Sequence, residues 1–379
     1  MKVLVLNAGS SSLKFDLFDA APDESRPERL LGKGEIARVA DMGQALREAF
    51  DRLAPLLDGE QVEAVGHRVV HGGDRFHESV IIDAAVEKEI ESLCSLAPLH
   101  NPHNLEAYRA ARAHLPDAQH VAVFDTAFHF TLPPQAYAYG LPYEYLTEKK
   151  IRRYGFHGIS HRYVSWRFAQ LHGKTRADYR MITCHLGNGC SVCAIDRGRS
   201  VDTSMGFTPL EGLLMGTRSG DVDAGAIVHL ITHENVAPEA LLGILNSQSG
   251  LKGLSGVSND MRDVMRAAES GSDPLHVRAQ LAVDIFCYRV RKYIGAYLAA
   301  MNGADVLIFT AGIGENAPSI RSRICAGLSN LGITIDEREN QTGSKEARRI
   351  GNGSIPVWIV PTEEELLIAR DTLRCIRAA

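Results

Sequence analysis

Short apolar runs separated by polar turns recur along the chain, and their spacing predicts alternating strands and helices. Compact runs rich in valine, isoleucine and leucine predict strands over residues 3–6, 13–18, 64–70, 120–124, 180–185, 191–196, 305–309 and 355–360. Apolar side chains three or four positions apart predict helices over residues 44–57, 86–96, 104–114, 277–301 and 364–377. This alternation is typical of an α/β fold.

Two segments from different halves of the chain follow the same pattern. Residues 4–10 (Leu-Val-Leu-Asn-Ala-Gly-Ser) match residues 182–188 (Ile-Thr-Cys-His-Leu-Gly-Asn). Each is an apolar strand, a turn of small residues and a second strand that leads to an acidic residue. The repeat predicts two related α/β domains that face each other, with one phosphate-binding hairpin each and a ligand site in the cleft between them.

Composition and charge narrow the class of protein. A chain of 379 residues is long enough for two domains, and its net charge of −5 provides no basic field for nucleic acid. No run approaches the roughly 18 apolar residues of a membrane span, and the apolar run 3–6 is too short for a secretory signal. The seven scattered cysteines argue against a disulfide framework. We expect a cytoplasmic protein that binds neither nucleic acid nor a membrane.

The first hairpin carries a candidate phosphate site. Gly9 and the serines 10–12 can point backbone N–H groups and hydroxyls into one concavity, and Lys14 adds a mobile positive charge. Asn7 offers an uncharged oxygen that could orient a metal-bound water. Ordinary hairpins also use glycine and serine in their turns, so this stretch alone leaves both interpretations open.

The second hairpin, residues 184–189, strengthens the phosphate interpretation, although Asn-Gly is by itself a common two-residue turn. Cys190 and Cys193 are spaced like a redox or zinc pair. They lie on a predicted strand, where an odd separation places side chains on opposite faces, and no second cysteine pair completes a zinc site. We therefore expect a structural role for both cysteines.

Residues 310–316 (Thr-Ala-Gly-Ile-Gly-Glu-Asn) form a third small-residue turn, between a predicted buried strand and a helix with Pro318 in its first turn. Such residues let a purine or ribose approach the backbone closely. A dinucleotide fingerprint is the rival interpretation, but its third glycine is absent and the motif lies near the C-terminus. Residues 258–262 could lie opposite and hold the nucleotide.

Histidines and arginines gather at further turns. Histidine pairs four residues apart, 67 with 71 and 157 with 161, resemble metal-ligand spacing, but no HExxH motif accompanies them. Arg68 and Arg218 adjoin glycine-containing turns or strand ends, where side chains can converge on a cleft. Two guanidinium groups and a histidine suit a small carboxylate and a phosphoryl group in transfer.

Together these motifs closely resemble the acetokinase family, within the superfamily of acetate and sugar kinases, heat-shock chaperones and actin. The similarity covers almost the whole chain and is carried by residues 7–14, 66–73, 98–102, 123–129, 153–157, 184–189, 202–220 and 309–316. It implies an α/β fold of two duplicated ribonuclease-H-like domains, as in actin-like ATPases, with a central nucleotide cleft.

The resemblance also implies domain limits and an assembly. Residues 1–148 with the C-terminal helix 365–379 would form the N-terminal acetokinase domain, and residues 149–364 the C-terminal nucleotide-binding domain. A homodimer is expected from the family.

The reaction implied by the resemblance is reversible phosphoryl transfer from ATP to acetate, which gives acetyl phosphate and ADP, with Mg²⁺ or Mn²⁺ as the metal. The catalytic residues would be Asp125, His157 and Arg218, and the metal ligands Asn7 and Glu364. Arg68 would bind the carboxylate in a methyl-sized pocket of Val70, Leu99, Phe156 and Pro209. The nucleotide-binding residues would be Ser10, Ser12, Lys14, His185, Leu186, Gly187, Asn188, Gly189, Asp260, Met261, Arg262, Gly312, Ile313, Gly314, Glu315 and Asn316.

Two details modify this assignment. A carboxyl group such as that of acetate titrates near pH 4–4.5 (about the value of glutamate) and needs no general base at neutral pH. We therefore expect Asp125 to orient substrate or metal-bound water. Glu363 stands where the family more usually has Asn or Asp, which leaves open which of residues 363–365 faces the metal.

Two alternatives remain open. A propionate or butyrate kinase of the same family differs by small changes in the acyl pocket, and one methylene is worth only ~1–3 kcal/mol of discrimination. An ATPase switch of the chaperone or actin type is the more distant alternative. Such a switch would have no use for Arg68, His157 and Arg218 around a methyl-sized pocket.

Overall fold

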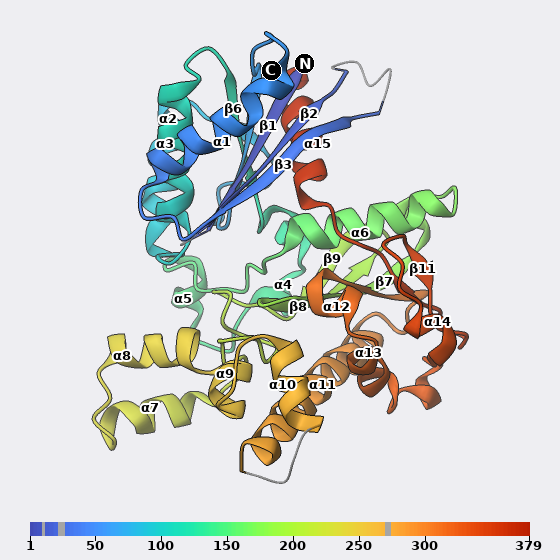
Figure 1. Ribbon diagram of the computed structural model, residues 1–379. Coiled ribbons are helices and arrows are strands. Elements are labelled where there is room, and N and C mark those ends of the chain that lie inside the picture. The colour runs from blue at the N-terminus through green and yellow to red at the C-terminus, as the bar shows by residue number, and fades with distance from the viewer. Residues whose placement is uncertain (10–11, 22–26, 270–273) are drawn as a thin grey trace. The chain divides into compact units, whose positions relative to one another are not determined.

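The computed structural model describes residues 1–9, 12–21, 27–269 and 274–379, which form two compact units (Figure 1). Unit 1 comprises Met1–Phe130 and Glu363–Ala379, and unit 2 comprises Thr131–Thr362. The predicted limits lay at 148/149 and 364/365. Residues 131–148 fall in unit 2 because their backbone is bound there: Ala138 forms a β-bridge with Arg152, and Arg153 N donates to Tyr137 O at 2.8 Å.

Unit 1 is built on a six-stranded sheet with the strand order β3-β2-β1-β4-β6-β5. Its strands are β1 (Lys2–Ala8), β2 (Ser12–Asp19), β3 (Arg29–Ala37), β4 (Ala64–Val69), β5 (Val80–Ile81) and β6 (Gln119–Phe124). The pairs β1–β2 and β2–β3 are antiparallel, whereas β1–β4 and β4–β6 are parallel. The parallel strands therefore end at one edge, where Arg68 and Asp125 stand.

Helices cover both faces of this sheet. Leu4 and Leu6 belong to one hydrophobic core with side chains of α1 (Met42–Leu57) and α3 (Asn101–His114). Gly66, one position from Val65 in the same strand, faces the opposite way. A Cβ built there would lie 2.3 Å from Thr372 Oγ1 in α15 (Glu364–Ala378), so the C-terminal helix packs closely on the second face. Helix α2 (Ala84–Ser92) and α3 also contact each other.

Unit 2 repeats the topology of unit 1. Its sheet has the order β11-β12-β10-β7-β8-β9, in which β7–β8 and β8–β9 are antiparallel and β7–β10 and β10–β12 are parallel. The strands are β7 (Arg180–Leu186), β8 (Cys190–Asp196), β9 (Arg199–Thr203), β10 (Val306–Thr310), β11 (Arg348–Arg349) and β12 (Val357–Ile359). The predicted duplicated α/β fold is therefore confirmed.

Several elements escaped the sequence pattern. The edge strand β3 carries exposed polar and glycine residues that mask the strand period, and four of the five residues of the edge strand β9 are polar. Helix α6 (Gly158–Leu171) is buried on more than one side. The predicted long helix is confirmed as α11 (Pro274–Ala300). The remaining helices of unit 2 are α4 (Pro134–Tyr137), α5 (Tyr143–Thr147), α7 (Ala224–Thr232), α8 (Pro238–Gly243), α9 (Gly250–Ser255), α10 (Met261–Glu269), α12 (Ala311–Asn316), α13 (Pro318–Cys325) and α14 (Glu337–Gln341).

Cys190 and Cys193 are both fully buried in β8, as expected for structural residues, and neither forms a disulfide. Across the described residues, helices with the length and apolarity needed to cross a membrane are absent.

Candidate functional site

The ends of the parallel strands in unit 1 bring three predicted site residues together. Arg68 in β4 donates from Nε to Asp125 Oδ1 at 3.2 Å and from Nη2 to Asp125 Oδ2, and its Nη1 donates to Asn7 Oδ1 at 3.1 Å. Asp125 follows β6 directly and is 1 % exposed. The guanidinium is therefore held by a bidentate ion pair and an amide, which fixes its plane.

Carboxylates surround this arginine. Burial lowers the pKa of Arg68, but the charges of Asp125 and Glu364 outweigh that effect and raise it above its usual value. Burial raises the pKa of Glu364 to about 7; the Arg68 cation opposes this shift, and the Asp125 charge adds to it. The first turn of α15 thus contributes a carboxyl group to the same electrostatic cluster.

The three consecutive glutamates at the start of α15 differ in their surroundings. Glu363 is exposed and precedes the helix, whereas Glu364 and Glu365 are half-buried. Glu365 accepts a hydrogen bond from Asn7 Nδ2 at 3.4 Å. The predicted metal pair of Asn7 and Glu364 therefore has Glu365 as a third neighbour.

The predicted phosphate hairpin contributes Lys14 and Ser12. Lys14 is exposed and pairs directly with Asn7 across β1 and β2. Gly9 N donates to Ser12 O at 2.8 Å, which closes the turn. Ser10 lies outside the described residues.

The residues of unit 1 that were predicted to line the acyl pocket have unequal exposure. Val70 is 5 % exposed, and its backbone N–H donates to Asn104 Oδ1 at 3.1 Å, while Asn104 Nδ2 donates to Ala8 O at 2.8 Å. Asn104 thus ties the Val70 backbone to the end of β1. Leu99 is 49 % exposed in the loop before α3.

In unit 2, His157 and Arg218 converge on the turn of the second hairpin. A Cβ built on Gly189 would lie 3.3 Å from His157 Nε2 and 3.7 Å from Arg218 Nη1. His157 has φ of 56°, a left-handed conformation that is uncommon outside glycine and clusters at functional sites. Its ring stacks on that of His185, with centroids 4.1 Å apart. Phe156 beside it is 1 % exposed.

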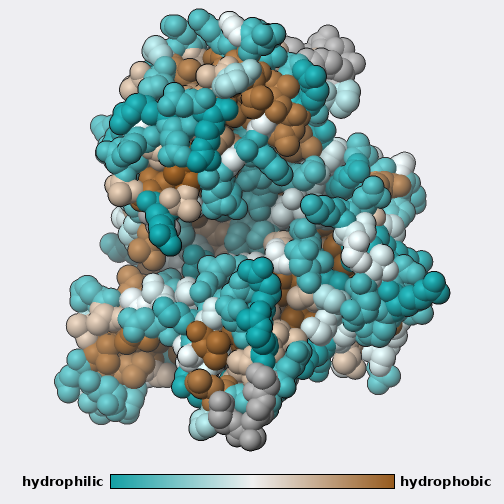
Figure 2. Space-filling view, viewed as in Figure 1, coloured by the Kyte–Doolittle hydropathy of each residue, from teal (hydrophilic) through white to brown (hydrophobic). Residues whose placement is uncertain are grey.

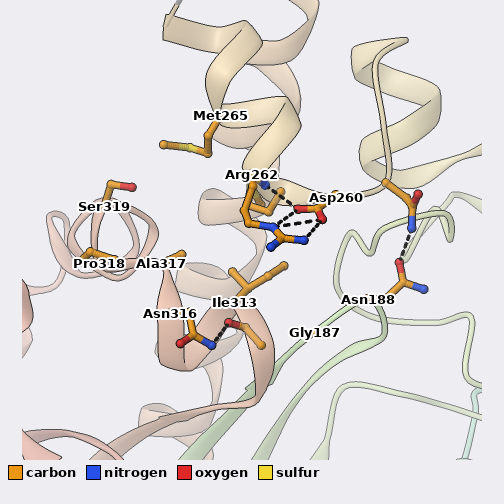
Figure 3. A pocket seen from close by; sticks show the side chains of 13 residues that line it. Gly187, Asn188, Asp260, Arg262, Met265, Ile313, Asn316, Ala317, Pro318 and Ser319 are labelled. Carbon is orange, nitrogen blue, oxygen red and sulfur yellow. Dashed lines mark hydrogen bonds and ion pairs between the residues drawn. The ribbon is translucent and has the colours of Figure 1, made fainter. Parts of the chain in front are cut away.

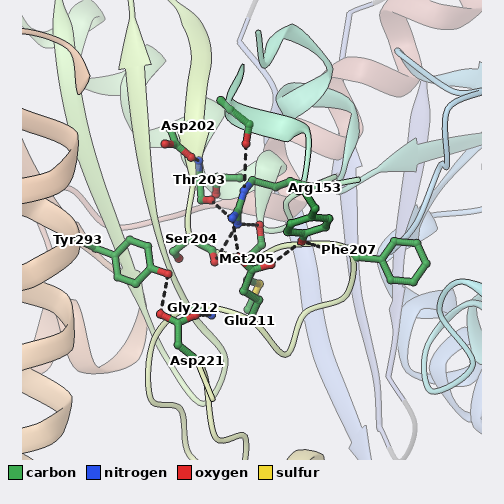
Figure 4. A network of polar contacts seen from close by, with 12 residues as sticks. Arg153, Asp202, Thr203, Ser204, Met205, Phe207, Glu211, Gly212, Asp221 and Tyr293 are labelled. Atoms are coloured by element: carbon green, nitrogen blue, oxygen red, sulfur yellow. Dashed lines mark hydrogen bonds and ion pairs between the residues drawn. The ribbon is translucent and has the colours of Figure 1, made fainter. Parts of the chain in front are cut away.

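A partly buried ionic network supports the loop that carries Arg218 (Figure 4). Arg153 donates from Nη2 to Glu211 Oε1 and from Nη1 to the carbonyls of Thr203 and Met205, both at 3.0 Å. The Tyr139 hydroxyl donates to Glu211 Oε2 and accepts from Phe207 N at 2.8 Å. The network thus binds the first part of the loop from two sides.

The same loop is connected to the segments of both predicted catalytic residues, His157 and Arg218. Tyr154 N and Gly155 N donate to Gly206 O at 3.0 and 3.2 Å, two residues before His157. Arg218 Nη1 donates to Pro209 O at 3.3 Å. Pro209, a predicted lining residue, is therefore a direct neighbour of the arginine.

The loop also has an anchor at its far end. Asp221 Oδ1 accepts from Gly212 N at 2.8 Å, and Asp221 Oδ2 accepts from the Tyr293 hydroxyl of α11 at 2.9 Å. Burial, followed by the Asp221 charge, raises the pKa of Tyr293 and keeps its hydroxyl protonated.

Unit 2 also contains a cavity of about 610 Å³, large enough for a nucleotide (Figure 3). The predicted residues that line it are Gly187, Asn188, Asp260, Met261, Arg262, Gly312, Ile313 and Asn316. Arg262 binds Asp260 through both carboxylate oxygens and lowers the pKa of Asp260 to about 2. Figure 3 shows this pair above Ile313, on opposite walls of the cavity.

Other predicted nucleotide residues play different parts. The Glu315 carboxylate accepts from Ala311 N at 2.8 Å and from Thr362 N at 3.2 Å, so it holds the backbone and does not line the cavity. Ala311 has φ of 65°, which this contact helps to hold. Four other predicted residues, His185, Leu186, Gly189 and Gly314, do not line the cavity either. Leu186 and Gly314 are buried.

Four lining residues were not predicted from the sequence: Met265, Ala317, Pro318 and Ser319. A fifth, Asn259, lies within the segment 258–262 that was expected to hold the nucleotide. Met265 stands one helical turn after Met261, so helical spacing could have found it. Asn259 Nδ2 donates to Asn188 Oδ1 at 3.1 Å, which joins two walls of the cavity.

Metal binding by protein groups alone is not indicated. Within the described part of the chain, no group of three or more His, Cys, Asp or Glu side chains could hold a metal ion. Mg²⁺ commonly uses one or two carboxylates together with substrate phosphates and water. Asn7, Glu364 and Glu365 fit that donor set.

Comparison with known proteins decides the family. The model of the Acetokinase family matches residues 2–370. The chain belongs to the acetokinase family. It is 47 % identical over 405 residues to the acetate kinase of Dictyoglomus thermophilum, and the match covers 99 % of each protein.

Solved structures of this family agree with the fold. The propionate kinase of Francisella tularensis superposes with a TM-score of 0.90 at 39 % identity, covering 98 % of this chain and 99 % of that one. The acetate kinase of Porphyromonas gingivalis gives a TM-score of 0.88, also at 39 % identity, with 99 % of both chains covered.

Proposed function

We propose that this acetokinase-family chain is an acetate kinase that transfers a phosphoryl group reversibly between ATP and acetate. The observation that carries the proposal is the fixed guanidinium of Arg68. Three of its five N–H groups donate to Asp125 and Asn7, and no other described residue accepts from it. Two N–H groups then remain for a small carboxylate.

The nucleotide would bind in unit 2. The cavity near Asp260 and Arg262 has the volume for an adenosine group. The turn at Gly187–Gly189, which connects β7 to β8, lies beside this cavity. His157 Nε2 and Arg218 Nη1 flank that turn and can donate to phosphoryl oxygens. Arg218 would act as an internal arginine finger.

Phosphoryl transfer depends on positioning and charge stabilisation more than on covalent help. The acetate carboxylate attacks the γ-phosphorus in line, and the γ-phosphorus–oxygen bond to ADP breaks. Asp125 orients Arg68 and therefore the attacking carboxylate, and it takes no proton. Asn7 and Glu364, with Glu365 beside them, would hold Mg²⁺ or Mn²⁺, which neutralises phosphate charge.

Incubation of the purified chain with ATP, Mg²⁺ and acetate tests this function, with acetyl phosphate trapped by hydroxylamine. We expect hydroxamate to form and ADP release to require acetate. Release of ADP at the same rate without acetate would support an ATPase switch and contradict the proposal.

A propionate kinase is the second candidate, because the propionate kinase of F. tularensis has the TM-score of 0.90. Val70, Leu99, Phe156 and Pro209 would set the acyl length. A ranking of kcat/KM for acetate, propionate and butyrate separates these candidates; acetate should rank first.

We further propose a cytoplasmic homodimer. Support comes from an apolar surface on α7 and α8, where Figure 2 shows brown side chains gathered in unit 2. Val228 is 57 % exposed and Leu242 is 49 % exposed. Sedimentation velocity should give the mass of two chains.

A further inference from the structure

A chain of hydrogen bonds leads from a buried threonine to His157. Thr183 Oγ1 in β7 lies 2.7 Å from His161 Nδ1, and His161 Nε2 lies 2.8 Å from Ser191 Oγ in β8. The same Ser191 oxygen lies 2.8 Å from His157 Nδ1. Thr183, His161 and Ser191 are all 0 % exposed. His161 is the i+4 partner of His157 that the motif analysis left without a role.

The direction of this chain follows from its first member. A buried hydroxyl hydrogen needs an acceptor, and His161 Nδ1 is the acceptor that the Thr183 hydroxyl finds among the described residues. Thr183 therefore donates to Nδ1, so a neutral His161 carries its proton on Nε2.

The remaining bonds then have one arrangement. His161 Nε2–H donates to Ser191 Oγ, and the Ser191 hydroxyl hydrogen is left to donate to His157 Nδ1. A neutral His157 whose Nδ1 accepts a hydrogen bond carries its proton on Nε2. That is the atom that lies 3.3 Å from a Cβ built on Gly189, a position that Arg218 Nη1 also faces, at 3.7 Å.

We propose that Thr183, His161 and Ser191 are positioning residues that hold His157 in the tautomer with the proton on Nε2. The inference deepens the acetate kinase assignment of this site and rests on it for its catalytic meaning. With this tautomer, His157 presents a donor to a phosphoryl oxygen; with the other, it would present a lone pair to an anion.

The tautomer can be measured without any turnover. In the full-length protein labelled with ¹⁵N-histidine, two-bond ¹H–¹⁵N correlation spectra above the histidine titration range distinguish the two neutral forms. The set of histidine signals that is missing from the spectrum of His157→Gln belongs to His157. We expect the pattern of Nε2 protonation for His157. A wild-type His157 protonated on Nδ1 would overturn the proposal, whether or not the protein is an acetate kinase.

A matched pair of variants tests the catalytic meaning. Thr183→Val removes the donor with little change of shape, whereas Thr183→Ser keeps a hydroxyl. Loss of one hydrogen bond should shift the tautomer ratio and lower kcat by about 3- to 10-fold. The KM for ATP should stay the same, and Thr183→Ser should restore both signals and kcat.

Thr372→Val serves as the control for a buried hydroxyl, because Thr372 Oγ1 donates to Ile368 O at 2.8 Å within α15. Thermal unfolding of all three variants identifies any that fail to fold. If Thr183→Val does not fold, Ser191→Ala replaces it in the same comparison. Unchanged His157 signals and unchanged kcat in a folded Thr183→Val or Ser191→Ala protein would refute the positioning role.

Discussion

At the scale of single residues, Arg68 and Asp125 depend on each other. Asp125 is buried and accepts two hydrogen bonds from Arg68, so removal of either partner would leave a charge without its counterion. In the proposed reaction, Asp125 therefore acts by orienting Arg68, because the acetate carboxyl group is already ionised at neutral pH and has no proton to give up.

We predict that Asp125→Asn lowers kcat by about 10²–10³, because Arg68 loses the charge that orients it. The pH profile of the remaining kcat should keep its wild-type shape. Steady-state kinetics across neutral pH measure both quantities. Asp371→Asn is the control, since Asp371 is also buried and paired, with Arg374 at 2.7 Å. A single ionisation that limits wild-type kcat and disappears in Asp125→Asn would contradict this role.

At the scale of elements, two histidines join β4 to β6 beneath the site. His120 Nε2 donates to Leu115 O at 3.1 Å, so a neutral His120 accepts on Nδ1 from His67 Nε2 at 2.9 Å. Burial lowers the pKa of His67 well below its usual value, with a contribution from the charge of His120, and burial also lowers the pKa of His120. Both rings are therefore neutral in the folded protein.

We predict that this pair makes unit 1 sensitive to acid. Above the ordinary histidine pKa, about 6.5, these two histidines are neutral in both the folded and the unfolded chain. Below that pH they are protonated only in the unfolded chain, so the free energy of unfolding falls as the pH falls. The free energy of unfolding should drop by about 1.4 kcal/mol per pH unit for each histidine. Urea titrations at several pH values measure how the free energy of unfolding depends on pH. This dependence should be shallower in His120→Gln than in the wild type and unchanged in His233→Gln, because His233 is exposed. Equal slopes in all three proteins would argue against the prediction.

The loop between β9 and α7 depends on a glycine for its ionic anchor. A Cβ on Gly206 would lie 1.6 Å from Glu211 Oε2 and 2.3 Å from the Tyr139 hydroxyl oxygen. Space for this Cβ requires the Glu211 carboxylate to leave Arg153.

We predict that Gly206→Ala destabilises unit 2 by about 1–3 kcal/mol, the usual cost of overpacking. It should also lower kcat, because the loop carries Arg218. Gly140→Ala is the control, since a Cβ at Gly140 meets nothing within 4 Å. Denaturant titration and kinetics measure the two effects; a Gly206→Ala protein with wild-type values in both would show that the anchor is dispensable.

At the scale of the whole molecule, the proposed reaction requires groups from both units. Arg68 belongs to unit 1, and His157 and Arg218 belong to unit 2. If Arg68 and Arg218 act on one transition state, their removal must be non-additive.

We predict that Arg68→Ala chiefly raises the KM for acetate and that Arg218→Ala lowers kcat by about 10³–10⁵. The loss of kcat/KM in the double variant should be smaller than the product of the single losses. A double-mutant cycle measures this coupling. Losses that multiply without coupling would show that the two arginines act independently.

The sequence by itself determined the elements and the duplication. Continuous apolar runs predicted the central strands, because strands that are buried on both faces have apolar side chains throughout. The matching segments at 4–10 and 182–188 predicted the repeat. Asn188 and Ile313, which line the cavity of unit 2, could be predicted as site residues because runs of small residues directly after buried strands are local signals. Edge strands β3 and β9 were not found, since their polar and glycine residues interrupt that pattern.

Only the tertiary structure decided which side chains meet. The sequence placed Glu315 at the nucleotide, but its carboxylate binds the backbone at Ala311 and Thr362. Nothing local connects Arg153 to Glu211 or Thr183 to His161, because these contacts join segments that are distant along the chain. Periodicity specifies which face of an element is buried, whereas the pairing of elements decides which polar groups on that face become partners.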